Sequence, residues 1–205
     1  MIELYAITDH PGPPLPDVAP LRVVPIDGLA GVYSTASDAE LSPEALWRHE
    51  EVVEALMADR DLLPVRYGTR LDDEAAIARA LEERREELAA ALDRVRGAVE
   101  LSVRAAAPGA PEPAGAGGSD YLRARARAAS GHDRTAKVLH EPLSALARAS
   151  VEGTPHPPEL FRAAYLVEHD AVERFTEAVG RLQNANQGLS LLCTGPWPPY
   201  SFAER

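Results

Sequence analysis

The second half of the chain places strand-like and helix-like stretches in an order that few folds accommodate. Strands are expected, mostly from alternating apolar and polar side chains, at residues 99–105, 147–151, 161–167 and 189–194. Helical stretches are expected at residues 120–146 and 170–182, between the first two and the last two of these strands. The order strand, helix, strand, strand, helix, strand predicts a split βαβ, or ferredoxin-like, unit with an antiparallel sheet.

The first half predicts a smaller α+β unit. Strands are expected at 1–8, 22–26 and 29–35, and Asp27-Gly28 is a hairpin-turn signal between the last two. A helix should follow, with Ser42 as its N-cap and its end near residue 59.

Residues 62–67 form the next candidate strand. Pro64 lies inside it and has no amide hydrogen, so an edge strand or a bulge is required here. Gly68 favours a turn with positive φ.

A long, strongly charged helix is expected between the two units. Its apolar stripe consists of Ile77, Leu81, Leu88, Leu92 and Val95. The complete prediction is an α+β protein in which two small α+β modules are joined by this helix. The N-terminal module spans residues 1–70, the linking helix 71–97, and the ferredoxin-like module with its tail 98–205.

The chain ends in a stiff aromatic tail. After Gly195, three prolines fix φ near −65° and remove amide donors, so the tail must leave the sheet in an extended form. Its aromatic residues are Trp197, Tyr200 and Phe202. Because prolines restrict the unfolded chain, ordering this tail loses little entropy, and we expect the aromatic side chains to be docked.

Charge and composition restrict the class of protein. The formal net charge is −11 at pH 7, which argues against binding to nucleic acid or to anionic membranes. A single cysteine, Cys193, excludes an internal disulfide and fits a reducing compartment. The sequence shows neither a signal peptide nor an apolar run of membrane-spanning length, so we expect a soluble cytoplasmic protein.

No catalytic or metal-binding set emerges from the residues. The six histidines do not form a helical zinc motif, and no paired cysteines or phosphate-binding loop are present. His49 falls on the apolar face of its helix with Leu46 and Val53, which favours a packing role over metal binding. We therefore expect no enzyme activity, no metal and no cofactor.

Three segments resemble a known family. They are Leu62–Thr69 with the sequence LLPVRYGT, Ala163–Val167 with AAYLV, and Thr194–Phe202 with TGPWPPYSF. Together they are similar to the gas vesicle protein GvpF/GvpL family, in the family's order and in both halves of the chain.

The resemblance implies an accessory or minor structural protein of gas vesicles, the gas-filled protein shells of some prokaryotes. The implied role is nucleation or assembly, and the implied location is the gas vesicle. Implied partners are the small hydrophobic shell protein and other gas vesicle proteins. A competing interpretation is a small-molecule-binding protein or enzyme, because the ferredoxin-like fold hosts many functions.

The segments that carry the resemblance supply the candidate site residues. We expect these residues either to bind a partner, by strand addition or through a groove, or to hold the domains together. They are Pro64, Arg66, Tyr67, Gly68, Tyr165, Gly195, Pro196, Trp197, Pro198, Pro199, Tyr200 and Phe202.

Overall fold

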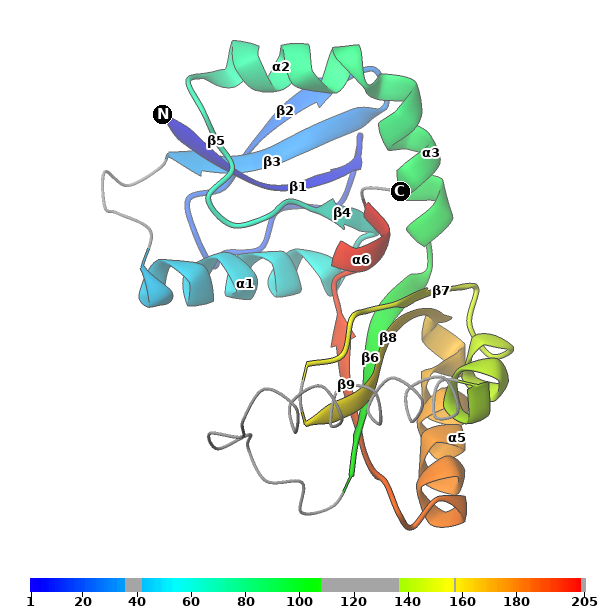
Figure 1. Ribbon diagram of the computed structural model, residues 1–205. Coiled ribbons are helices and arrows are strands. Elements are labelled where there is room, and N and C mark those ends of the chain that lie inside the picture. The colour runs from blue at the N-terminus through cyan, green and yellow to red at the C-terminus, as the bar shows by residue number, and fades with distance from the viewer. Residues whose placement is uncertain (36–41, 108–136, 157, 204–205) are drawn as a thin grey trace. The chain divides into compact units, whose positions relative to one another are not determined.

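The computed structural model describes residues 1–35, 42–107, 137–156 and 158–203. The chain forms two compact units (Figure 1). The first unit contains Met1–Ala98 together with the end of the chain from Trp197, and the second contains Val99–Pro196. Both units combine helices with a sheet, so the fold class is α+β, as predicted. The units do not coincide with the predicted ranges, because residues 71–97 and the tail both pack within the first unit.

The sheet of the first unit is built around its N-terminal strand. Its strands are β1 (Ile2–Asp9), β2 (Arg22–Ile26), β3 (Leu29–Thr35), β4 (Leu62–Pro64) and β5 (Arg70–Leu71). The order is β2-β3-β1-β4, and β5 also pairs with β1. The predicted hairpin is confirmed: β2 and β3 pair antiparallel, and the turn places Asp27 and Gly28 at φ 37° and 86°.

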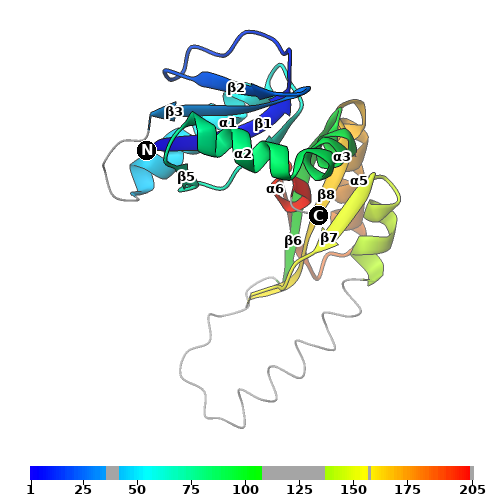
Figure 2. The same ribbon diagram turned by 90° about the horizontal axis from the view of Figure 1, so that it is seen from above.

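Helices cover both faces of this sheet. Helix α1 (Pro43–Met57) lies on one face, and α2 (Glu74–Glu83) lies on the other (Figures 1 and 2). As predicted, the Ser42 side chain caps α1 by accepting a hydrogen bond from the Ala45 amide at 3.2 Å. On the α2 side, Gly31 permits close approach, because a Cβ there would lie only 2.7 Å from Ile77.

The expected single long helix at 71–97 is instead two helices, α2 and α3 (Arg85–Val95). Arg84 interrupts them with φ −118° and ψ 16°. The change of direction lets both helices bury their apolar stripes, from Ile77 and Leu81 to Leu92 and Val95. The acidic residues in the middle of the predicted helix include Glu86 and Glu87, which lie in the first turn of α3, where carboxylates are stabilised by the helix dipole.

The second unit has the predicted ferredoxin-like strand order. Its strands are β6 (Ala98–Ala106), β7 (Ala149–Glu152), β8 (Glu159–Glu168) and β9 (Ser190–Trp197), in the order β7-β8-β6-β9. Numbered within this unit, the order is 2-3-1-4, that of a split βαβ. Much of the predicted helix at 120–146 lies outside the described residues, and its described end is helical over 137–144.

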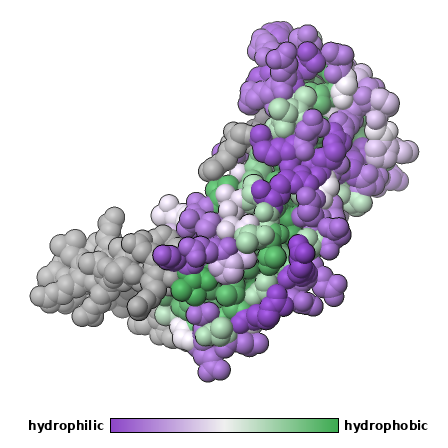
Figure 3. Space-filling model, turned by 90° about the vertical axis from the view of Figure 1, so that its right-hand side faces the viewer, coloured by the Kyte–Doolittle hydropathy of each residue, from purple (hydrophilic) through white to green (hydrophobic). Residues whose placement is uncertain are grey.

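Helix α5 (Val172–Ala185) follows the short 3₁₀ turn η1 (His169–Ala171) and packs on this sheet. The core between this helix and the sheet contains Phe161, Tyr165 and, from the helix itself, Phe175, all with no exposed area. Hydrophobic residues gather over the second unit on the face drawn in Figure 3, whereas hydrophilic residues cover most of the first unit there. No helix among the described residues is long and apolar enough to cross a membrane.

Candidate partner-binding site

The C-terminal tail is docked within the first unit. Pro198 and Pro199 are buried, and Phe202 is 3% exposed. The short helix α6 (Tyr200–Ala203) packs against β4 and α3. Trp197 differs from the other tail aromatics, because 41% of its surface is exposed. Most of the aromatic tail is therefore part of the first unit's core.

Tyr200 connects the tail to α1. Its hydroxyl donates to both carboxylate oxygens of Glu50, at 3.2 and 3.3 Å. Burial raises the pKa of Tyr200, and the neighbouring negative charge of Glu50 raises it further. The hydroxyl thus remains protonated and able to donate at neutral pH.

We expect Tyr200→Phe to lower the free energy of unfolding by about 1 kcal/mol near neutral pH, because one hydrogen bond to a carboxylate is lost. A phenol whose pKa is raised in the folded state stabilises the fold below its ordinary pKa of 10.0. That contribution is lost as the pH rises further, because the unfolded phenol ionises first.

Urea unfolding across the alkaline range should therefore show a steeper loss of stability in the wild type than in the variant. Identical pH dependence of the two proteins would contradict the role assigned to this hydroxyl.

Strand β4 is an edge strand, one of the two alternatives that Pro64 predicted, and it ends at Pro64 rather than at residue 67. Among the described residues, its one partner strand is β1, where Pro64 lies opposite Ala6. All three residues of β4 are buried, and both α3 and α6 pack against it. Helices α3 and α6 thus pack on this short, buried strand, which disfavours the addition of a partner strand to it.

A buried histidine holds the segment after β4 in place. His49 on α1 is 1% exposed, and its Nε2 lies 2.9 Å from the Val65 carbonyl oxygen. Its Nδ1 lies 2.9 Å from a carboxylate oxygen of Glu3 on β1. The ring also contacts Tyr5 and Tyr67, with centroids 4.9 and 5.6 Å away. This geometry agrees with the predicted packing role of His49, whereas Leu46, predicted on the same apolar face, is 40% exposed.

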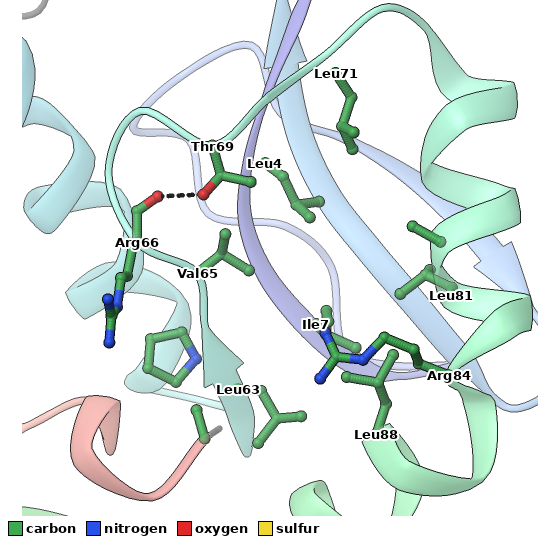
Figure 4. A pocket seen from close by; sticks show the side chains of 13 residues that line it. Leu4, Ile7, Leu63, Val65, Arg66, Thr69, Leu71, Leu81, Arg84 and Leu88 are labelled. Atoms are coloured by element: carbon green, nitrogen blue, oxygen red, sulfur yellow. Dashed lines mark hydrogen bonds between the residues drawn. The ribbon is translucent and has the colours of Figure 1, made fainter. Parts of the chain in front are cut away.

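The turn after β4 explains the predicted Tyr67 and Gly68. The Tyr67 hydroxyl accepts a hydrogen bond from the Ser42 amide at 3.2 Å, at the start of α1. Gly68 has φ 84°, a conformation that favours glycine. The Thr69 hydroxyl closes the turn by donating to the Arg66 carbonyl at 2.8 Å (Figure 4). These residues shape the turn.

Beside this turn lies a mainly apolar pocket of about 300 Å³ (Figure 4). Strand β1, the segment from β4 to β5, helices α2 and α3, and α6 all contribute to its wall. Its lining residues are Leu4, Ile7, Leu63, Pro64, Val65, Arg66, Thr69, Leu71, Ala80, Leu81, Arg84, Leu88 and Ala203. Pro64 and Arg66 are the predicted site residues found here. The pocket is our candidate site for a partner.

The charged groups of the pocket lie on two of its walls. Arg66 extends from the turn, and Arg84 extends from the break between α2 and α3 (Figure 4). Arg84 donates from Nε and Nη2 to the two carboxylate oxygens of Glu87, at 3.0 and 2.6 Å. This ion pair satisfies much of the guanidinium charge, so the pocket is suited chiefly to apolar groups.

The predicted site residues Tyr165, Gly195 and Pro196 lie in the second unit. Tyr165 has no exposed area, and its hydroxyl lies 3.1 Å from His140 Nδ1. Burial raises its pKa, and the nearby Glu152 adds to the shift. Tyr165 is therefore a core residue with a satisfied hydroxyl. Gly195, with φ 122°, and Pro196 are exposed and lie within β9, which continues to Trp197. The expected departure from the sheet after Gly195 is therefore wrong, and the tail ends in helix α6 rather than in an extended form.

The described residues contain no group of three or more histidine, cysteine or acidic side chains arranged to hold a metal ion.

Several residues that line the pocket could not be identified as site residues from the sequence. Leu81 and Leu88 were recognisable only as members of a helical stripe, and Leu4 only as a strand residue. No local pattern indicated that they share one cavity.

Comparison with known proteins places the chain in a family. Residues 3–204 match the family described as gas vesicle synthesis protein GvpL/GvpF. Gas vesicle protein L of Streptomyces sp. (strain CB03234) is 33% identical, over 91% of this chain and 75% of the relative. Gas vesicle protein F of the same strain is 30% identical over 98% of both chains. Gas vesicle protein F2 of Halobacterium salinarum is 30% identical, over 82% of this chain and 72% of the relative.

Solved structures show the same fold. The crystal structure of GvpF from Anabaena sp. PCC7120 has a TM-score of 0.81 and 21% identity, covering 100% of this chain and 96% of that one. GvpF from Microcystis aeruginosa also gives 0.81, with 20% identity and coverage of 100% and 99%. On the strength of the sequence match across nearly its whole length, this chain belongs to the GvpL/GvpF family of gas vesicle proteins.

Proposed function

We propose that this protein acts in the nucleation or assembly of gas vesicles by binding the small hydrophobic shell protein. Family membership supports the gas vesicle role. The observation that carries the binding proposal is the mainly apolar pocket of about 300 Å³ in the first unit. Apolar side chains of a shell subunit would enter this pocket, which would remove them from water before assembly.

The geometry favours a groove-type contact over strand addition at β4. The strand is buried beneath α3 and α6, whereas the pocket beside it is open enough to receive side chains. Under this proposal the protein works at the gas vesicle in the cytoplasm and catalyses no reaction. Other gas vesicle accessory proteins are further partners, and they would use surfaces outside the pocket.

The test is a variant that fills the pocket without disturbing the core. Ala80 lines the pocket from the exposed side of α2, so Ala80→Trp places an indole over the opening while the protein remains folded. We expect binding to the organism's own shell protein to weaken about tenfold, corresponding to roughly 1.4 kcal/mol. Co-purification followed by titration of the purified proteins provides the measurement.

The matched control is Ala90→Trp. Ala90 is exposed on α3 and does not line the pocket, so the same substitution there should leave binding unchanged. Circular dichroism would verify both folds. Equal binding by Ala80→Trp and the wild type would move the contact away from the pocket. Failure of the wild type to bind the shell protein would refute the proposed partner.

A further inference from the structure

Helix α1 carries an exposed tryptophan on the side opposite its buried face. Trp47 has 73% of its surface exposed, and its neighbour Leu46 has 40% exposed. The buried face of the same helix consists of His49, Val52, Val53 and Leu56. Single exposed apolar residues are common, but a tryptophan this exposed offers a partner a large apolar ring.

The surroundings of Trp47 are mainly acidic, although its neighbour in the chain, Arg48, is an exposed base. Glu50, Glu51 and Glu54 follow it at spacings of three, four and seven residues, which place them on the same side of the helix. Among the described residues, none of these three carboxylates forms an ion pair with an arginine or a lysine. We call Leu46, Trp47, Glu50, Glu51 and Glu54 the acidic tryptophan face.

The C-terminal tail fixes one edge of this face. The Tyr200 hydroxyl donates to both carboxylate oxygens of Glu50, which restrains that side chain. A restrained carboxylate loses less rotamer entropy when a partner binds, so this contact prepares the face for binding.

We propose that the acidic tryptophan face binds a basic amphipathic helix of a partner protein. An ammonium or guanidinium group lies favourably over an indole ring and is attracted by the surrounding carboxylates. The apolar side of the partner helix would cover Leu46 and the rest of the ring. The same carboxylates repel anionic lipids and nucleic acids, and a second copy of this acidic face would also be repelled.

This surface is separate from the pocket. Helix α1 lies on one face of the sheet, whereas the pocket-lining helix α2 lies on the other (Figures 1 and 2). The inference therefore does not depend on shell-protein binding, and each proposal can fail without the other.

The experiment titrates the full chain with a synthetic helical peptide of about 18 residues, long enough to form a stable helix and built from leucine, alanine and lysine. A second peptide carries glutamate in place of every lysine. We expect calorimetry to detect the lysine peptide alone, with binding that weakens as salt is raised. Trp47→Ala should weaken it about tenfold, and Glu51→Gln with Glu54→Gln should do the same.

The matched control neutralises two carboxylates elsewhere. Glu82→Gln with Glu83→Gln removes the same charge from exposed positions on α2, and binding should stay within about twofold of the wild type. If the two double variants weakened peptide binding equally, the affinity would depend on net charge alone, and the proposal would be overturned. An unchanged affinity in Trp47→Ala, or no binding of the lysine peptide, would also overturn it.

Discussion

Phe202→Ala is expected to lower the free energy of unfolding of the first unit by about 3 kcal/mol, near the lower end of the range for buried phenylalanine. Phe202 is 3% exposed, and the helix that carries it packs against β4 and α3. Truncation leaves a cavity beneath α6 and weakens the cover over the edge strand. Urea denaturation followed by circular dichroism measures the loss.

The same tail provides the matched control. Trp197 is 41% exposed, so Trp197→Ala should cost less than Phe202→Ala despite removing a larger side chain. If Trp197→Ala destabilised the protein as much as Phe202→Ala, the burial of Phe202 would not explain how the tail stabilises the first unit. Binding studies should therefore use point variants of the tail. Deleting the whole tail would remove α6 and uncover β4, so a loss of binding could not be separated from misfolding.

His49→Ala is expected to lower the free energy of unfolding by about 3 kcal/mol. The substitution opens a cavity and leaves two hydrogen-bonding groups, the Val65 carbonyl and the Glu3 carboxylate, without their buried partner. The same loss frees the segment after β4, so the turn beside the pocket should exchange its amide hydrogens faster. Hydrogen exchange together with urea denaturation would detect both effects.

A substitution at Glu3 separates the hydrogen bonds from packing. Both ring nitrogens of His49 face oxygen acceptors, so a neutral imidazole can donate to only one of them. In Glu3→Gln, the new amide can donate to Nδ1 while Nε2 still donates to Val65. This variant should therefore lose no more than about 1 kcal/mol.

Arg48→Ala is the control on the same helix, and it should change stability by less than about 0.5 kcal/mol because Arg48 is exposed. A cost for Arg48→Ala equal to that of His49→Ala would show that the loss is a general property of α1.

The sequence by itself determined the features that depend on near neighbours in the chain. Alternating side chains specified the strands of the second unit, and their order with the helices specified the ferredoxin-like plan. Asp27-Gly28 specified a hairpin, Ser42 a helix start, and Pro64 an edge strand or a bulge. Each of these follows from a backbone restriction or a periodicity that spans only a few residues.

Only the tertiary structure decided which distant segments meet. The tail docks beside β4 and bonds to Glu50, 150 residues earlier in the chain, and no local pattern encodes that pairing. The break at Arg84 has the same origin, because a continuous helix satisfies local propensity but would not keep both apolar stripes on the sheet. The pocket likewise exists only where β1, the segment after β4, α2, α3 and α6 converge. Packing between segments distant in sequence, rather than periodicity within one segment, therefore determined the candidate site.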